Sequence, residues 1–322
     1  MAIFKTDVLI IGAGVSGITT ALSLLDAGVP ASSLRLIADR PPALTTSSSA
    51  GAIWGLFLSP TDQGGREWGR YTLHRLNDLA GVPDTGISLV RGVLATRAVD
   101  EPPDWVKEVQ DFRLCTPDEL PAEFVSGWRY TVPVIDMPVY LRYLHKRLAQ
   151  AGVTVEIGRF ASLGEATAKA PIVVNCTGLG ARRLVPDDTM RPVRGQLVVV
   201  ENPGITEFFD EYIDGVPELT YLLPMGDRVV LGGSAEDGVA ECSVDPRVAE
   251  RILKRCAVVA PRLRDVKVLG HRVGLRPMRP TVRLEREDIR GVPVVHNYGH
   301  GGSGVSLSWG CAHAVTRLVL AV

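Results

Sequence analysis

The strongest constraint on the fold lies near the N-terminus, where the apolar run Val8 to Ile11 leads into the glycine-rich segment Gly12-Ala13-Gly14-Val15-Ser16-Gly17. A short apolar run of this kind predicts a buried parallel strand. Apolar residues at helical spacing from Val15 to Ala27 predict a helix that stops at Gly28. A second strand is predicted from Leu34 to Ala38. Strand, helix and strand within about 35 residues form the opening unit of a doubly wound α/β fold.

The three glycines of this segment have separate roles in a turn that can bind phosphate. Gly12 permits the tight turn, Gly14 lets the backbone approach a pyrophosphate, and Gly17 lets helix and strand pack closely. The phosphates would lie at a helix N-terminus, where free N–H groups favour negative charge. Asp39 closes the second strand about 20 residues further on and can accept hydrogen bonds from ribose hydroxyls. A dinucleotide site is therefore predicted. FAD and NAD both remain open, whereas the charge of Asp39 disfavours NADP, and Arg40 is a phosphate or surface contact.

Two further loops contain glycines. Asn175 to Gly180 follows a predicted buried strand, and this turn suits a ligand-binding edge as well as a routine connection. His296 to Gly304 precedes a predicted helix. Two anion-accepting helix N-termini suit a ligand with two phosphates and a flavin ring better than they suit NAD alone. His296 and His300 have no third ligand at credible spacing, so no metal site is predicted. His300 is expected to be structural, with general base work as the alternative.

The segment Gly274 to Pro280 places a proline directly after Arg276 and another after Arg279, and Arg283 follows. Proline stiffens the backbone and holds the preceding residue extended. A rigidly held guanidinium fork matches both oxygens of a carboxylate. This segment is therefore a candidate carboxylate clamp, and the alternative is three surface arginines in a loop.

Both ends of the chain are predicted to belong to one discontinuous cofactor domain. Its expected residues are 1–54, 139–190 and 287–322, and 55–138 with 191–286 are expected to form an α+β substrate domain centred on a mostly antiparallel sheet. Apart from the elements already described, the periodicity predicts helices near 67–80, 140–151 and 248–260 and from Val305 onward, and strands at 153–157, 172–175, 196–201, 221–223, 229–232 and 292–296. The last two strands before residue 235 form a hairpin around Met225-Gly226-Asp227.

Composition excludes several classes of protein. The net charge of −1 over 322 residues, with dispersed lysines and arginines, argues against nucleic acid or an anionic membrane as a partner. The 5 cysteines form no C-x-x-C pair, so buried reduced thiols are expected rather than zinc or a disulfide framework. Asp7 and three glycines interrupt the apolar N-terminus, which therefore does not resemble a signal peptide. No window is apolar enough for a membrane helix, and no S-K-L address ends the chain, so a cytoplasmic location is expected. A homodimer is left open.

Together these residues resemble the D-amino-acid oxidase family, which includes D-aspartate oxidase, and the chain looks like a bacterial member. The resemblance covers nearly the whole chain, and its last motif is specific. The matching residues, in order, are Gly12-Ala13-Gly14-Val15-Ser16-Gly17, Ala38-Asp39-Arg40, Leu44-Thr45-Thr46, Asn175-Cys176-Thr177-Gly178, Arg194-Gly195-Gln196, Gly274-Leu275-Arg276-Pro277-Met278-Arg279-Pro280 and His296-Asn297-Tyr298-Gly299-His300-Gly301-Gly302.

The resemblance implies a non-covalent FAD on a Rossmann-like doubly wound FAD-binding domain. It assigns the diphosphate to the turn after the first strand, the ribose to the end of the second strand, and the adenine to the backbone near Phe160. The flavin would lie between the loop at 45–53 and the loop at 301–306. The residues implied at the cofactor are Gly12, Ala13, Gly14, Val15, Ser16, Gly17, Asp39, Arg40, Thr45, Thr46, Ser47, Gly51, Ala52, Ile53, Phe160, Thr177, Arg276, Gly301, Gly302, Gly304, Val305 and Ser306.

For the substrate, the resemblance implies that Arg276 grips the α-carboxylate, that the Tyr221 hydroxyl adds to that grip, and that the Gly302 carbonyl accepts from the α-amino group. The Cα–H of a D-isomer then points at flavin N5 and passes as hydride. Catalysis is largely orientation and desolvation, because no side-chain base is required if the amine binds neutral. The imine hydrolyses to a 2-oxo acid and ammonia, and dioxygen reoxidises the flavin to give hydrogen peroxide.

Three departures from the family pattern concern the pocket. Pro217 stands where many relatives have a lid tyrosine, although Tyr212 could reach in, and Gly55 and Phe57 replace more polar residues. No extra cation matches a side-chain carboxylate, so neutral, bulky or branched D-amino acids are expected over D-aspartate. The alternatives are an oxidase of glycine or secondary amines, an NAD-linked dehydrogenase and a non-catalytic flavin-binding protein.

Overall fold

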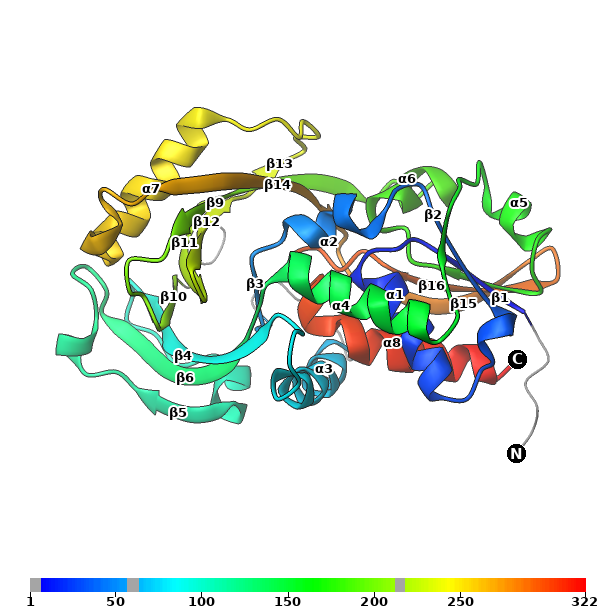
Figure 1. Ribbon diagram of the computed structural model, residues 1–322, viewed down its shortest axis with the longest axis horizontal. Coiled ribbons are helices and arrows are strands. Elements are labelled where there is room, and N and C mark those ends of the chain that lie inside the picture. Colours follow the sequence, from blue (N-terminus) through cyan, green and yellow to red (C-terminus); the bar gives the residue numbers. More distant parts are fainter. Residues whose placement is uncertain (1–6, 57–63, 212–217) are drawn as a thin grey trace.

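The computed structural model describes residues 7–56, 64–211 and 218–322. Figure 1 shows a curved sheet on the left and a second sheet with most of the helices on the right. Phe57, Tyr212 and Pro217, on which part of the expectation about the pocket rested, lie outside the described residues. No helix formed by the described residues is long and apolar enough to cross a membrane.

The right-hand sheet has six strands among the described residues and is parallel except at one edge. Its order is β15 (Arg283–Ile289), β16 (Val292–Tyr298), β8 (Ile172–Asn175), β1 (Val8–Ile11), β2 (Leu34–Ala38) and β7 (Val155–Ile157). The pairs β1–β2, β1–β8, β8–β16 and β2–β7 are parallel, and β15 is antiparallel to β16. The predicted unit of strand, helix and strand is confirmed as β1, α1 (Val15–Asp26) and β2.

Both faces of this sheet are buried, as a doubly wound fold requires. Successive side chains of a strand point to opposite faces, and β1 shows this directly. Val8 and Ile10 join the core that includes Ile18 of α1, whereas Leu9 and Ile11 join a separate core. The first core includes side chains of α4 (Met137–Gln150) and α8 (Gly304–Leu320), and the second includes side chains of α5 (Leu163–Thr167) and α6 (Ala181–Leu184).

The left-hand sheet is mostly antiparallel, as expected, with β10–β4 as a parallel pair. Its main path is β13 (Glu236–Asp237), β9 (Arg191–Glu201), β12 (Arg228–Ser234), β11 (Glu218–Met225), β10 (Phe208–Glu211), β4 (Ile87–Thr96), β6 (Ser126–Ile135) and β3 (Ala52–Ile53), with β14 (Val268–Met278) paired to β9 and β5 (Gln110–Leu114) paired to β6. The predicted hairpin is confirmed, because Met225 of β11 pairs with Arg228 of β12.

The two faces of this sheet also differ. Leu222 and Leu231 pack with Ile252 of α7 (Pro246–Val259) on one face. Tyr221 and Val230 belong to the larger core on the other face, which is shared with the parallel sheet. Only this second face is placed to contribute to a site between the sheets.

Several strands differ from the sequence-based expectation. The long strands β4 and β6 were not predicted. The alternative interpretation, three surface arginines in a loop, does not hold for Arg276 and Arg283, which lie in β14 and β15. Proline lacks an N–H and is confined to edge strands in a sheet. Pro277 is accommodated because β14 pairs with β9 alone among the described strands.

The predicted domain boundaries stay a prediction. The edge strand β15 runs across the expected division between residues 286 and 287. Helix α3 (Gly65–Ala80), within the expected substrate domain, packs closely on α8: a Cβ at Gly310 would lie 2.2 Å from the carbonyl oxygen of Trp68. The Gly310 N–H also donates to the Thr72 hydroxyl at 3.0 Å.

Candidate active site

A cavity of about 1030 Å³ lies between the two sheets and receives residues from both. This volume is at the upper end for ligand sites, which suits a long cofactor together with a substrate. All but two of the predicted site residues line it: Gly12, Ala13, Gly14, Val15, Ser16, Asp39, Arg40, Thr45, Thr46, Ser47, Gly51, Ile53, Phe160, Thr177, Tyr221, Arg276, Gly301, Gly302, Gly304, Val305 and Ser306. Gly17 and Ala52 lie behind the wall, because Gly17 packs on Gly12 and Ala52 pairs with Ile135 of β6.

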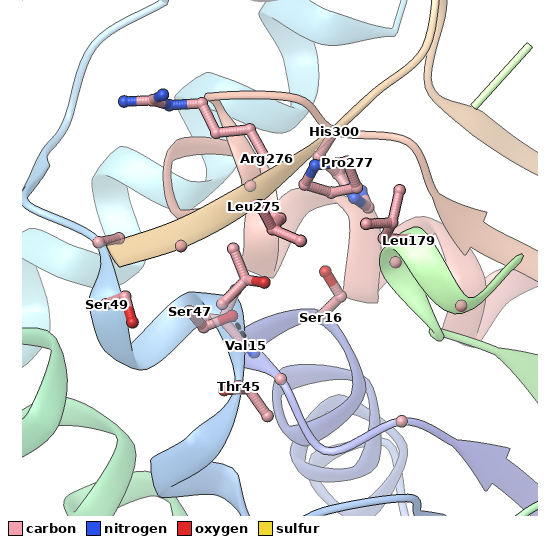
Figure 2. A pocket seen from close by; sticks show the side chains of 18 of the residues that line it. Val15, Ser16, Thr45, Ser47, Ser49, Leu179, Leu275, Arg276, Pro277 and His300 are labelled. Atoms are coloured by element: carbon pink, nitrogen blue, oxygen red, sulfur yellow. Dashed lines mark hydrogen bonds between the residues drawn. The ribbon is translucent and has the colours of Figure 1, made fainter. Parts of the chain in front are cut away.

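The turn between β1 and α1 requires its glycines. Gly12 has a φ of +109°, and a Cβ there would lie 2.3 Å from the carbonyl oxygen of Cys176. A Cβ at Gly17 would lie 1.8 Å from the Gly12 carbonyl oxygen, so strand and helix could not pack so closely. The Val15 N–H donates to the Ser47 hydroxyl at 3.0 Å, which ties the short helix α2 (Thr46–Ser49) before β3 to the start of α1 (Figure 2).

The end of β2 presents a charged pair to the same cavity. Arg40 and Asp39 form an ion pair at 3.1 Å with about half of each side chain exposed. Hydrogen bonding to Asp39 raises the pKa of Arg40. Phe160 and its neighbours from Gly158 to Ala161 line this end as well, so the predicted ribose and adenine contacts lie together.

A buried chain of hydrogen bonds fixes the ends of β8 and β16. The Asn175 side-chain oxygen accepts from the Thr177 N–H at 3.2 Å and from its hydroxyl at 2.7 Å. The Asn175 amide nitrogen lies 3.2 Å from His296 Nδ1, and because an amide nitrogen only donates, Nδ1 must accept. The proton of His296 is then on Nε2, 2.9 Å from Glu287. Burial lowers the pKa of His296, so a neutral structural histidine fits this position.

The loop before α8 contains a second buried histidine with a different environment. His300 is 3% exposed, and burial lowers its pKa to about 4. Its Nε2 has no hydrogen-bond partner among the described residues, and the residue lines the cavity. A buried polar atom of this kind is expected to meet a partner, which a bound ligand would supply. The adjacent Gly301 N–H donates to the Pro277 carbonyl at 3.0 Å and so joins this loop to β14.

Arg276 extends from β14 to a position near Gly195 and Ser234. Its Nη1–H donates to the Ser234 carbonyl at 2.9 Å, and a Cβ at Gly195 would lie 2.4 Å from Nη1. No ion pair to Arg276 occurs within the described part of the chain, although the residue lines the cavity. Figure 2 shows its side chain pointing away from Val15 and Ser16. The remaining guanidinium donors are therefore available to an anion.

Tyr221 lies on β11 against two glycines. A Cβ at Gly232, its partner on β12, would lie 1.8 Å from the tyrosine ring, so only glycine leaves room for the ring. The tyrosine hydroxyl would lie 3.3 Å from a Cβ at Gly51, in the loop predicted to line the flavin. Burial raises the pKa of Tyr221, which keeps the hydroxyl neutral and able to donate.

The cavity also has a wall that sequence reasoning missed. Leu197, Leu219 and Leu223 form apolar surface near Tyr221, and Asp210 of β10 lies beside them. Burial raises the pKa of Asp210 to about 8. The available signal was a carboxylate directly after the aromatic pair Phe208-Phe209, but no strand was predicted there.

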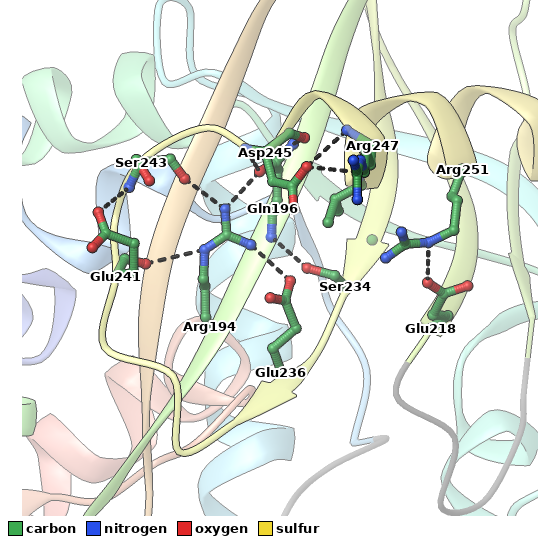
Figure 3. Close-up of polar contacts among 12 residues, drawn as sticks. Arg194, Gln196, Glu218, Ser234, Glu236, Glu241, Ser243, Asp245, Arg247 and Arg251 are labelled. Atoms are coloured by element: carbon green, nitrogen blue, oxygen red, sulfur yellow. Dashed lines mark hydrogen bonds and ion pairs between the residues drawn. The ribbon is translucent and has the colours of Figure 1, made fainter.

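The loop after β13 extends to the cavity from the antiparallel sheet, because Ala240 lines it. Arg194, whose side chain is 3% exposed, holds this loop in place. Its guanidinium donates to the Glu241 carbonyl at 3.0 Å, the Ser243 carbonyl at 2.6 Å and the Glu236 carboxylate at 2.7 Å (Figure 3).

The donors around this cavity fit FAD. The N-termini of α1 and α8 both open into it, so the helix starts predicted to contact the diphosphate and the flavin end lie in one cavity. The charged pair after β2 suits the ribose, and the unpartnered His300 Nε2 suits a polar group of the ligand. Among the described residues, no group of three or more His, Cys, Asp or Glu could hold a metal ion.

Comparison with known proteins supports this interpretation. Residues 7–318 match the DAO family model, described as FAD dependent oxidoreductase. The chain is 44% identical over 312 residues to the D-amino-acid oxidase of Rubrobacter xylanophilus, covering 96% of this chain and 94% of that protein. It is 42% identical over 315 residues to the D-amino-acid oxidase of Streptomyces coelicolor, covering 97% and 96%. The solved glycine oxidase of Geobacillus kaustophilus shares the fold, with a TM-score of 0.81 at 19% identity over 98% of this chain and 95% of that one. The chain therefore belongs to the DAO family of FAD-dependent oxidoreductases.

Proposed function

We propose that this protein oxidatively deaminates D-amino acids to 2-oxo acids, with release of ammonia and hydrogen peroxide. The observation that carries the proposal is the convergence of Arg276, Tyr221 and Gly302 on one cavity. These residues come from β14, β11 and the loop before α8, which are far apart in the sequence. The relatives named D-amino-acid oxidase, which align over nearly the whole chain, support the same activity.

Arg276 and Tyr221 have the chemistry to hold the α-carboxylate. A guanidinium without a carboxylate partner can bind a substrate carboxylate through two parallel N–H···O bonds. The neutral Tyr221 hydroxyl can donate a further bond. The Gly302 carbonyl, in the loop joined to β14 by the Gly301–Pro277 hydrogen bond, is the proposed acceptor for the α-amino group. Three fixed points orient one enantiomer, and this orientation supplies most of the catalysis proposed here.

FAD held in this cavity would supply the acceptor for the Cα hydride and the means of passing the two electrons to dioxygen. Tyr221 and His300, the titratable side chains nearest the proposed carboxylate and amine contacts, are not suited to act as the base: burial raises the pKa of Tyr221 and lowers the pKa of His300 to about 4. The protein would therefore bind the amine neutral and exclude water, because apolar side chains form much of the wall near Tyr221.

The proposed substrate class has neutral members, for which the three leucines offer a suitable surface. D-aspartate is disfavoured, because the wall beside Tyr221 offers a second carboxylate no cation, only apolar side chains and Asp210, whose pKa burial already raises. The positions of Phe57, Tyr212 and Pro217 add nothing to this argument, since they lie outside the described residues.

The test is the absorption spectrum of the purified protein before and after addition of D-alanine or D-leucine without oxygen. We expect flavin absorption that bleaches with the D-isomer and not with the L-isomer, followed by hydrogen peroxide production when air is admitted. Bleaching by sarcosine in preference to D-alanine would favour an oxidase of secondary amines. A flavin that no D-amino acid reduces would overturn the proposed activity.

A further inference from the structure

Asp210 occupies a position from which it can contact the side chain of a bound amino acid. It lies on β10 directly opposite Tyr221 of β11, and opposite residues of an antiparallel pair point to the same face. Both residues line the cavity. The aspartate side chain is shorter than that of the tyrosine, so its carboxylate lies nearer the sheet than the hydroxyl does.

The Asp210 carboxyl group has no ion-pair partner in the described part of the chain. The residue is 8% exposed, and its carboxylate accepts a hydrogen bond from the backbone N–H of Glu211. Glu211 itself, also buried, forms an ion pair with Arg97 at 2.7 Å. Two consecutive carboxylates therefore differ: one is neutralised by the protein, and the other faces the cavity without a cation.

A buried carboxylate without a cation is energetically unfavourable, so a stable fold gains nothing from Asp210 as it stands. Burial is the main cause of its raised pKa. The groups around it do not compensate, because Tyr130 and Tyr221 are neutral phenols. A residue that costs stability and faces a ligand cavity is expected to serve the ligand.

The side chains around Asp210 indicate which chemical groups the ligand contains. Leu219, Tyr221 and Leu223 alternate along β11 and so share a face, and Leu197 of β9 lines the same region. Apolar walls with a carboxylate beyond them fit a flexible aliphatic chain that ends in a cation.

We propose that Asp210 makes the site selective for D-amino acids with a cationic side chain, the class of D-lysine, D-ornithine and D-arginine. The side-chain cation pairs with the Asp210 carboxylate while the α-carboxylate is held by Arg276. The oxidation at Cα is unchanged, so this inference rests on the proposed function and adds a substrate class to it. Neutral side chains of similar length remain substrates of lower efficiency.

The test compares D-lysine with D-norleucine, which has the same carbon chain without the terminal amine. We expect kcat/KM to be at least about tenfold higher for D-lysine, because a charge-assisted hydrogen bond distinguishes the two. Asp210→Asn should reduce this ratio by about 10-fold to 100-fold, because the variant loses the charge that distinguishes the two side chains. Asp227→Asn, at the exposed tip of the β11–β12 hairpin, is the matched control and should preserve the ratio.

A second measurement tests the role of Asp210 without a variant, in case Asp210→Asn does not fold. Competitive inhibition of the unmodified enzyme by 6-aminohexanoate and by hexanoate compares the same two ends without oxidation, and 6-aminohexanoate should bind at least about tenfold more tightly. Equal or weaker inhibition by 6-aminohexanoate, or a kcat/KM for D-norleucine that matches or exceeds that for D-lysine, would overturn the role of Asp210. Failure of every D-amino acid to reduce the flavin would instead overturn the proposed function.

Discussion

Removal of the Arg276 guanidinium offers the most direct test of how this site holds a substrate. In the structure one donor of Arg276 is taken by the Ser234 carbonyl at 2.9 Å, and no carboxylate of the described residues pairs with the others. A substrate carboxylate would therefore gain two charge-assisted hydrogen bonds. Each contributes about 1.5–3 kcal/mol.

The expected effect of Arg276→Ala follows from these two bonds. Their loss amounts to about 3–6 kcal/mol, or roughly a 10²–10⁴-fold decrease in kcat/KM for a D-amino acid. Arg276→Lys keeps the charge but loses the planar fork, so a decrease of about 10-fold to 100-fold is expected. A loss of binding common to ground and transition state appears in KM, whereas loss of orientation appears in kcat.

Anaerobic flavin reduction, followed at increasing concentrations of D-alanine, separates these two effects. The flavin content of each variant must be measured first, because Arg276 was also expected to contact the cofactor. Arg247→Ala, an exposed arginine on α7, is the control for loss of a positive charge and should leave the kinetics unchanged. An Arg276→Ala enzyme with full flavin content and kcat/KM within about threefold of the original would refute the carboxylate clamp.

Three further outcomes follow from packing and burial. Gly12→Ala should give protein with little bound flavin by absorbance, because the new Cβ would lie 2.3 Å from the Cys176 carbonyl oxygen at a φ of +109°. Full flavin occupancy would contradict the role of the turn between β1 and α1 in binding the cofactor. Arg194→Ala should lower the unfolding free energy in urea by about 3 kcal/mol, since buried carbonyls and Glu236 lose their partner. The variant should also bind FAD more weakly. An unchanged unfolding free energy and unchanged FAD affinity would contradict the role of Arg194 in anchoring the loop after β13. Asp210→Asn should stabilise the substrate-free protein on the order of 1–4 kcal/mol at pH 7. The folded-state pKa is raised to about 8, so the original chain loses stability as pH rises from about 4 to 8. The gain of the variant should therefore grow over that range, and a gain that is constant with pH would argue against a buried Asp210.

The cofactor half of the molecule could be predicted in detail because its signals are local. The strands β1, β2 and β8 were placed at their observed bounds, since each is a short, largely apolar run that gives way to polar residues or glycine. The glycines of the first turn are required by contacts within about ten residues or with the adjacent strand. Even there, Ala52 was assigned to the cofactor on resemblance, and the structure places it in a strand pair behind the cavity wall.

The strands of the substrate half were harder to predict from the sequence. The long strands β4 and β6 carry mixed polar and apolar residues, and their pairing joins segments whose register no local pattern fixes. The segment with Arg276 was expected to be extended, but its membership of β14 depends on β9, which pairs with it across more than 70 residues of sequence.

The sequence alone determined the type of cofactor fold, the two glycine-rich helix starts and the residues proposed to grip an α-amino acid, because each depends on neighbours along the chain or on a specific motif. The tertiary structure decided which of these residues meet, since the strand order β14, β9, β12, β11 brings Tyr221 and Arg276 to the cavity that the Gly302 loop also lines. It also decided the environment of Asp210. In the sequence Asp210 is one of two adjacent carboxylates. Only the fold pairs Glu211 with Arg97 and leaves Asp210 at the cavity without an ion-pair partner among the described residues. Charge partners of this kind are long-range, so no local pattern encodes them.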